Sequence, residues 1–225
     1  MSDVKVKQSD TEKLVRDKIS ELLSFREEDQ DLKEFWGKQF DLGLAWVQFP
    51  EGAGGLGVYQ ILQLLVIEEL RKAGISQQNR IANILGIGMG APTIVEFGTK
   101  EQVDRYLRPM FIADEIWCQL FSEPGSGSDL ASLSTRAVDD GDSYILNGQK
   151  VWTTLGHLAK WGLVVTRTDP EVPKHRGLTF FIVDMEGDGV EVRPLRQITG
   201  EAEFNEIYFT DARVCLLYTS DAADE

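Results

Sequence analysis

The 225-residue sequence has little of what several protein classes require. Its two cysteines, Cys118 and Cys215, form neither a metal-ligand spacing nor a disulfide framework. No apolar run approaches the ~18 residues that span a bilayer, and the polar start at 1–10 resembles neither a secretory signal nor a transit peptide. Excess positive charge is also missing, because the net charge is −14. A surface this acidic argues against nucleic acid and anionic membranes as partners, so a soluble cytoplasmic protein is the simplest interpretation.

The common catalytic signatures are equally scarce. His157 and His175 stand alone, so surface or packing roles are favoured for both. Ser126 and Ser128 lie in a glycine-rich segment without the G-x-S-x-G pattern of a hydrolase. The composition itself, 42% hydrophobic and 27% charged, is that of a globular chain with room for one large domain or two ordinary ones.

Helical periodicity dominates the first half of the sequence. It predicts helices at 9–23, 32–40, 59–73, 87–97 and 99–109. Ser9 with Glu12, and Thr99 with Gln102, have the spacing of capping boxes, and Pro109 is expected to end the last helix. The 59–73 segment is apolar around most of its girth, which is typical of a helix buried among others.

Near Ala113 the pattern changes to that of strands. Strands are predicted at 116–121, 134–138, 144–146, 150–153, 162–168, 178–183, 190–194 and 206–209. Asp140-Gly141 and Asn147-Gly148 are signals for type I′ hairpin turns. Helices first and strands second predict an α+β chain with two segregated domains and argue against a doubly wound sheet.

A G-x-G-x-x-G pattern at Gly52, Gly54 and Gly57 lacks the context of a dinucleotide site. Such a site needs a strand before the glycines and an acidic residue at the end of a second strand. Here helices flank the pattern, so a tight turn between helices is the better interpretation.

Two later segments carry most of the chemical information. In 121–129, Phe-Ser-Glu-Pro-Gly-Ser-Gly-Ser-Asp, serine hydroxyls and free amides could surround a phosphate or a polar heterocycle. An ordinary strand-to-turn connection explains this composition equally well. In 147–154, Asn-Gly-Gln-Lys-Val-Trp-Thr-Thr, the flat face of Trp152 lies beside two hydroxyls, as a planar cofactor requires, although a half-buried core tryptophan is the more common explanation.

Together, these segments resemble the acyl-CoA dehydrogenase family. The family carries a T-E-P-x-A-G-S-D loop and a downstream L-N-G-x-K-x-W-I-T-N segment, matched here at 122–129 and 146–155. Further matches lie at 50–57, 68–70, 98–107 and 206–214. Several separate motifs in one order make the resemblance specific, and it covers nearly the whole chain up to Val214.

The resemblance implies an N-terminal helical domain at 1–113 and a middle β-barrel domain at 114–214, followed in the family by a helical bundle. It implies FAD as cofactor, bound by Gln119, Leu120, Phe121, Ser122, Gly127, Ser128, Trp152, Thr153 and Thr154. Ser128 would also contact the acyl-CoA substrate. Trp152 would pack on the isoalloxazine, and the Thr154 hydroxyl would lie near the hydride-accepting nitrogen.

The sequence departs from the family pattern in two ways. Within the motifs, Ser122, Ser126, Thr153 and Leu155 stand where the family has Thr, Ala, Ile and Asn. At the end, 215–225 neither resembles the family nor reads as a further strand or helix, so we expect an aberrant, non-native tail. The family's catalytic Glu comes from the helical bundle, so no catalytic residue is assigned here, and Glu123 matches only a structural position.

The resemblance predicts α,β-dehydrogenation of an acyl-CoA thioester to the 2,3-enoyl-CoA, with this chain alone inactive. It implies an electron-transferring flavoprotein as electron acceptor and a homo- or hetero-oligomeric full-length protein. The alternatives are a related acyl-CoA oxidase or monooxygenase, and a catalytically inactive flavin-binding subunit or fragment. The segments 122–133 and 197–204 look similar to bacterial members that handle branched or bulky acyl groups.

Overall fold

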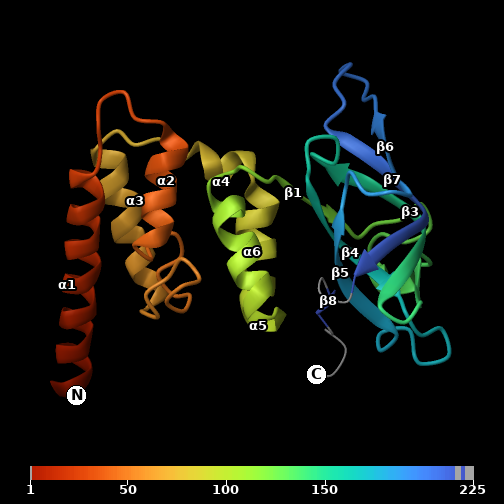
Figure 1. Cartoon of the computed structure of the whole chain (residues 1–225), viewed down its shortest axis with the longest axis horizontal. Helices are drawn as coiled ribbons and strands as arrows, with labels where there is room; N and C mark the ends of the chain where they lie inside the picture. The colour runs from red at the N-terminus through yellow and green to blue at the C-terminus, as the bar shows by residue number, and fades with distance from the viewer. Residues whose placement is uncertain (1, 216–218, 221–225) are drawn as a thin grey trace. The chain divides into compact units, whose positions relative to one another are not determined.

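The computed structural model describes residues 2–215 and 219–220, and it consists of a helical region followed by a curled sheet (Figure 1). Two compact units divide it. One contains Met1–Ile84 and Val103–Asp114, and the other contains Leu85–Gln102 and Glu115–Glu225. The predicted α+β class, helices first and strands second, is confirmed. The domain boundaries drawn from the sequence stay predictions.

The first unit is built from helices around an apolar core. Its elements are α1 (Ser2–Ser24), α2 (Leu32–Asp41), the 3₁₀ turn η1 (Gln60–Leu62), α3 (Gln63–Lys72), α4 (Gln78–Ala82) and most of α6 (Lys100–Phe111). Asp31 caps α2 by accepting a hydrogen bond from the amide of Lys33, as an N-cap aspartate does. Phe40, Trp46 and Phe111 form ring contacts in the core of this unit.

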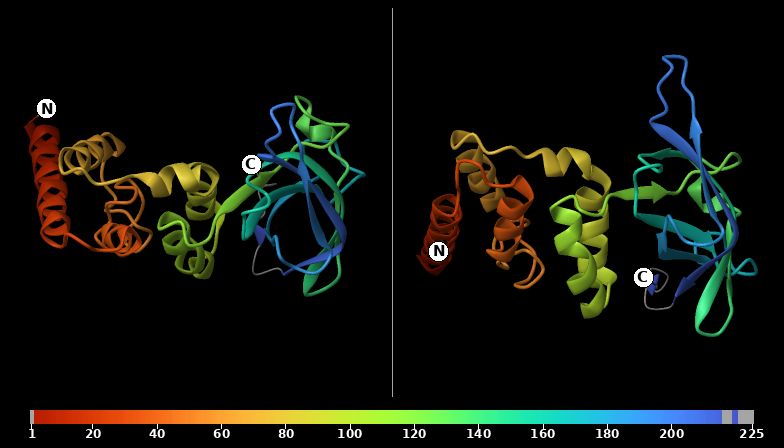
Figure 2. Two further views of the ribbon diagram at one scale, coloured as in Figure 1. Left: turned by 90° about the horizontal axis from the view of Figure 1, so that it is seen from above. Right: turned by 45° about the horizontal axis from the view of Figure 1, so that its top comes forward.

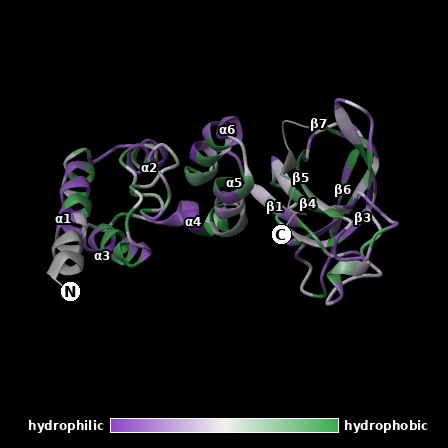
Figure 3. Ribbon diagram, turned by 90° about the horizontal axis from the view of Figure 1, so that it is seen from below, coloured by the Kyte–Doolittle hydropathy of each residue, from purple (hydrophilic) through white to green (hydrophobic). Residues whose placement is uncertain are grey.

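Three helix predictions were wrong in detail. α1 begins at Ser2, so Ser9 and Glu12 lie inside the helix instead of starting it. α6 continues past Pro109 to Phe111, because a proline disturbs the turn that precedes it more than the one that follows. The apolar girth of α3 is not fully buried: Leu64 is 59% exposed, while Val66 and Leu70 are buried. Figure 3 shows both hydrophilic and hydrophobic residues along α3.

The glycine-rich loop after α2 is a tight inter-helix turn, as predicted. The carbonyl oxygen of Gly54 accepts hydrogen bonds from the amides of Ala45 and Trp46, both at 3.1 Å. Gly54 has a φ of +80°, and a Cβ there would lie 2.6 Å from the ring of Phe40. Gly54 therefore serves close packing within the chain. Gly52 and Gly57, with φ of +85° and +64° and no atom within 4 Å of a Cβ, serve the left-handed backbone of the turn.

The second unit is a mixed sheet with two helical segments. Its strands are β1 (Trp117–Leu120), β2 (Arg136–Asp139), β3 (Ser143–Thr154), β4 (Trp161–Arg167), β5 (Leu178–Asp184), β6 (Val190–Leu195), β7 (Phe204–Cys215) and β8 (Thr219–Ser220). The order is β6-β7-β3-β2-β4-β5-β8, with β1 beside β4. Figure 2 shows this sheet curling round from two further directions. A short 3₁₀ turn, η3 (Leu130–Ser132), follows the loop after β1. A cluster of buried apolar residues, which includes Leu146, Val164 and Phe181, forms the core of this unit.

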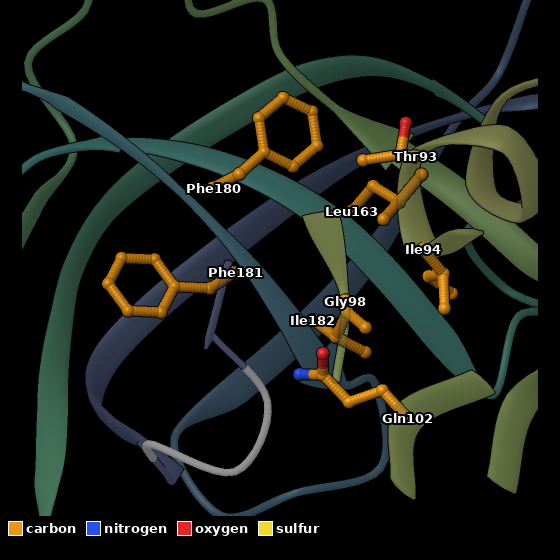
Figure 4. A pocket seen from close by; sticks show the side chains of 8 residues that line it. All are labelled: Thr93, Ile94, Gly98, Gln102, Leu163, Phe180, Phe181 and Ile182. Carbon is orange, nitrogen blue, oxygen red and sulfur yellow. The ribbon is translucent and has the colours of Figure 1, made fainter. Parts of the chain in front are cut away.

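One side of the sheet meets η2 (Gly86–Gly90), a π-helical turn, and α5 (Ala91–Phe97). Ile94 and Gln102 on the helical side and Leu163 and Ile182 on the strands surround a gap of about 10 Å³ (Figure 4). A gap of this size holds at most about one water, so it reflects packing and not a ligand site. The predicted capping box is confirmed, because Thr99 and Gln102 exchange side-chain-to-backbone hydrogen bonds at 3.3 and 2.8 Å.

The expected turn at Asn147-Gly148 was wrong, because both residues lie inside β3. β7 carries an extra residue opposite them, where Asp211 has a φ of +51°. The Asn147 side chain binds Asp211 twice, at 2.9 and 3.0 Å, and so caps this bulge. The hairpin at Asp140-Gly141 does join β2 to β3, but only Gly141 has a positive φ, so it is not a type I′ turn.

The segment 215–225 was expected not to continue the sheet. In the structure Cys215 ends β7, and β8 pairs with β5 through Phe180 and Phe181. The expectation was therefore wrong for these residues, and the rest of the segment lies outside the described residues. No helix in the described part of the chain is long and apolar enough to cross a membrane.

Candidate flavin site

The two segments singled out from the sequence lie side by side in the second unit. Gln119 and Leu120 end β1, and the loop 121–128 follows directly. Trp152, Thr153 and Thr154 end β3. The amide of Val151 donates a hydrogen bond to the carbonyl oxygen of Ser122 at 2.9 Å, which joins the loop to the strand. Residues about thirty positions apart in the sequence thus form one surface.

A β-bulge at the end of β3 sets the direction of Trp152. The register with β7 shifts by one residue between Lys150, opposite Ile207, and Thr153, opposite Asn205. Trp152 lies in this bulge with a φ of +61°, a left-handed conformation that is a genuine outlier for a bulky residue. The residue is 63% exposed, and its ring lies edge-to-face with that of Phe204, at 6.1 Å between centroids. Strain of this kind gathers at binding sites, where it aims a side chain.

The bulge is held from β7 by a buried amide. Asn205 is fully buried and donates a hydrogen bond to the carbonyl oxygen of Thr153 at 3.0 Å. Its side-chain nitrogen also lies 3.2 Å from Nδ1 of His157. The Thr153 hydroxyl is buried and has no hydrogen-bond partner among the residues that the structure describes. A buried hydroxyl without a partner costs free energy, and the hydroxyls of Thr135 and Thr166 in this unit share the condition.

The loop after β1 has a second such hydroxyl. Glu123 and Ser126 form a tight turn through two backbone hydrogen bonds, at 2.8 and 3.1 Å. Ser126 is 4% exposed, and its Oγ has no hydrogen-bond partner within the described part of the chain. Gly125 and Gly127 have no positive φ, and a Cβ on either would meet no atom within 4 Å. The chain's own packing therefore does not require these two glycines, whereas a molecule lying against the loop would.

Beneath this surface lies a buried ion pair that sequence reasoning missed. Lys150 is fully buried, and its Nζ contacts Oε1 of Glu123 at 2.9 Å, the carbonyl oxygen of Phe121 at 3.1 Å and that of Val165 at 2.7 Å. Glu123 also accepts hydrogen bonds from Ser134 and Thr135. The available signal was a lysine among buried strand positions, which needs a buried acidic partner.

The surroundings of Glu123 keep it ionised. Burial by itself raises the pKa of a carboxyl, but hydrogen bonds from Thr135 and Ser134 and the charge of Lys150 outweigh it and lower the pKa of Glu123 to about 2. Burial lowers the pKa of Lys150, and Glu123 opposes that shift. Glu123 is thus a poor proton acceptor near neutral pH, in line with the structural role expected for it.

Cys118 and His175 do not join this surface. Burial raises the pKa of the Cys118 thiol, so it stays protonated and unreactive. His175 is exposed, in line with the surface role expected for it. In the part of the chain that the structure describes, no three His, Cys, Asp or Glu side chains gather as metal ligands.

Comparison with known proteins identifies the family. Residues 5–113 match the acyl-CoA dehydrogenase N-terminal domain and residues 118–212 match its middle domain. The chain belongs to the acyl-CoA dehydrogenase family. The acyl-CoA dehydrogenase FadE34 of Mycobacterium tuberculosis is 46% identical over 175 residues, covering 77% of this chain and 24% of FadE34.

Solved acyl-CoA dehydrogenase structures agree. The ChsE4-ChsE5 complex from Mycobacterium tuberculosis aligns with a TM-score of 0.67 and 30% identity, covering 94% of this chain and 56% of that chain. The Tcur3481-Tcur3483 steroid ACAD aligns with a TM-score of 0.65 and 28% identity, covering 93% of this chain and 56% of that chain. The chain spans 24% of FadE34 and little more than half of these solved chains.

The residues present fit the family's cofactor, FAD. An exposed tryptophan aimed by a strained bulge offers a flat wall for a planar ring system. The unpartnered hydroxyls of Ser126 and Thr153 offer hydrogen bonds. The open glycines at 125 and 127 allow the close backbone approach that a phosphate needs. These features belong to the two segments that the sequence pointed to.

Proposed function

We propose that this acyl-CoA dehydrogenase family chain forms the flavin-contacting part of an FAD-dependent enzyme that oxidises an acyl-CoA thioester to its 2,3-enoyl product. The observation that carries the proposal is the left-handed bulge that exposes Trp152 beside the buried, unpartnered hydroxyls of Ser126 and Thr153. The open glycines and the unpartnered hydroxyls are not needed for the packing of the described residues, whereas a planar cofactor would use each part of this arrangement.

The proposed roles of individual residues follow from their positions. Trp152 forms one wall of the ring site, and Thr153 and Thr154 provide hydroxyls beside it. In the loop 121–128, Ser122, Ser126 and Ser128 provide hydroxyls, and Gly127 lets the backbone approach the pyrophosphate. Gln119, Leu120 and Phe121 lead from β1 into this loop and fix its origin on the sheet. Ser128 is proposed to contact the substrate as well.

Bound FAD would supply the hydride acceptor for the β-hydrogen of the thioester. Removing the α-proton needs a general base whose pKa is near the working pH. Glu123 does not meet this need, because its pKa is about 2 and both of its oxygens accept hydrogen bonds. We therefore place the base in the portion of the family's length that the chain does not cover, and propose that the chain alone does not turn over substrate.

The names of similar proteins suggest the wider setting. The steroid ACAD among the solved structures supports a bulky acyl group as substrate, and the ChsE4-ChsE5 complex supports assembly with like or unlike chains. We further propose an electron-transferring flavoprotein as acceptor and a cytoplasmic location. Oxidation of a steroid-side-chain CoA thioester faster than a straight-chain one, by a full-length enzyme carrying this sequence, would support the first of these proposals.

Equilibrium titration with FAD tests the central proposal. The chain should bind FAD saturably, and Trp152→Ala should weaken binding by about tenfold, since an aromatic stacking wall is worth about 1–3 kcal/mol. Val138→Ala removes a comparably exposed apolar side chain on β2, 58% exposed, and should leave binding unchanged. Equal affinity for FAD in the wild type and in Trp152→Ala, or no saturable binding by the wild type, would contradict the proposal.

A further inference from the structure

We propose that the buried Lys150–Glu123 pair positions the loop 121–126 against the end of β3, which makes both residues positioning residues for the flavin site. The inference rests on the proposed function, because it concerns how that site is held together. It assigns neither residue a contact with cofactor or substrate.

The pair connects four separate segments. A lysine ammonium has three donors, and Lys150 uses them on Glu123, on the loop carbonyl of Phe121 and on the β4 carbonyl of Val165. The carboxylate of Glu123 in turn holds Ser134 and Thr135 at the entry to β2. The loop, the end of β3, β4 and the approach to β2 thus share one buried centre.

The site residues are direct neighbours of this centre. Phe121, held by Lys150, precedes Ser122, whose carbonyl oxygen accepts from Val151. Val151 follows Lys150 and precedes Trp152 in the bulge. A shift of the ammonium therefore moves both sides of the candidate site, the loop through Phe121 and the tryptophan through the strand.

A gain in folding stability does not by itself explain why an ion pair is buried at Lys150 and Glu123. Apolar side chains of similar volume usually stabilise a core as well as a buried ion pair or better. An apolar pair would not fix the positions of the loop and strand carbonyl groups. A charged donor with several hydrogen bonds does, because each bond specifies where its carbonyl lies. Other ion pairs of this unit differ: Lys160 with Asp184 is 33% and 39% exposed in its side chains.

The test compares variants of the full chain. Lys150→Met removes the donors, and Lys150→Met/Glu123→Gln also removes the buried charge that would be left unpaired. Lys160→Met is the control for loss of a lysine from an exposed pair. Val183→Ala, on β5 and 2% exposed, is the control for general loss of core stability. Two readouts are taken: amide hydrogen exchange at Ser126 and Val151 in the ligand-free chain, and the FAD dissociation constant.

Lys150→Met should speed exchange at both amides well beyond the change in Val183→Ala. It should also raise the FAD dissociation constant by about 10- to 100-fold, the loss of affinity that removing a supporting residue behind the direct ligands causes at metal sites. The double variant should regain thermal stability but keep the weakened binding, because neutralising the pair does not restore the hydrogen bonds to the loop. Lys160→Met should match the wild type in both readouts.

The proposal would be overturned if amide exchange and FAD affinity simply followed the unfolding temperature in all variants, including Val183→Ala. A wild type that fails to bind FAD would overturn the proposed function instead, while the exchange at Ser126 and Val151 would still decide whether the pair holds the loop.

Discussion

Single residues in unusual conformations mark the candidate site. Trp152 and Leu155 both have left-handed φ values, +61° and +60°, within four positions of each other. In the sequence, Leu155 was notable only because the family has asparagine at this position. The left-handed conformation of Leu155 explains why asparagine suits the position. Asparagine enters the left-handed region several times more readily than leucine does.

Leu155→Asn should therefore stabilise the chain by about 1 kcal/mol, since the left-handed conformation costs a leucine about that much. Urea unfolding monitored by circular dichroism measures the change. Leu158→Asn, three positions on and 61% exposed, is the control and should shift stability by no more than about 0.5 kcal/mol. Equal effects of the two substitutions would mean that the strain at Leu155 is negligible.

Glu123 should make stability depend on pH in the acid range. Its folded-state pKa is about 2, below the ordinary value of 4.5, so the folded chain binds fewer protons than the unfolded chain between these values. Its contribution is present above the unfolded pKa and is lost as the pH falls through the folded pKa.

Unfolding measured between about pH 5 and pH 3 should consequently show a steeper loss of stability in the wild type than in Glu123→Gln, which has no carboxyl to protonate there. Val138→Ala, which removes no ionisable group from an exposed position, serves as the control and should keep the wild-type slope. Parallel slopes for the wild type and Glu123→Gln would contradict the assignment.

At the scale of elements, helix α3 carries apolar residues of two kinds, some buried and some exposed. Leu70 is fully buried and Leu64 is 59% exposed on the same helix. Leu70→Ala should lower the free energy of unfolding by about 2–5 kcal/mol through lost transfer energy and a cavity. Leu64→Ala, the same change on the same helix, should cost less than about 1 kcal/mol. Chemical denaturation compares them, and similar losses would refute the packing described for α3.

Local signals predicted the elements well but not their details. The change of period near Ala113 located the transition from helices to strands, and Thr99 with Gln102 predicted a capping box that forms. The Asn147-Gly148 pair led to a wrong turn prediction. Its asparagine side chain instead binds Asp211 in the bulge of β7, 64 residues further along the sequence. Rules that use only neighbouring residues cannot predict a contact with a residue so far away in the sequence. The burial predicted for α3 was wrong for the same reason, since the apolar pattern does not say which faces of a helix pack against other elements.

The candidate site was predictable in part for the same reason. The loop 121–128 and the segment 152–154 were identified from residue types, and the structure joins them through Val151 and Ser122. The bulge at Trp152 and the Lys150–Glu123 pair could not be derived, because both depend on the pairing of β3 with strands far away in sequence.

At the scale of the whole molecule, the chain is a member of the acyl-CoA dehydrogenase family that covers its N-terminal and middle domains. It spans 24% of FadE34 and about half of the solved relatives, so the complete activity belongs to the proposal. The part of the activity that we assign to the described residues is the proposed surface for a planar cofactor. The central claim is that FAD lies against Trp152.

Tryptophan fluorescence tests that claim most directly, because Trp36, Trp46, Trp117 and Trp161 are buried and Trp152 is 63% exposed. Titration with FAD should quench the solvent-exposed, red-shifted emission of the wild-type chain saturably. In Trp152→Phe this quenching should vanish, while binding followed by flavin absorbance persists. Equal quenching in the two proteins, or no saturable quenching in the wild type, would contradict the account.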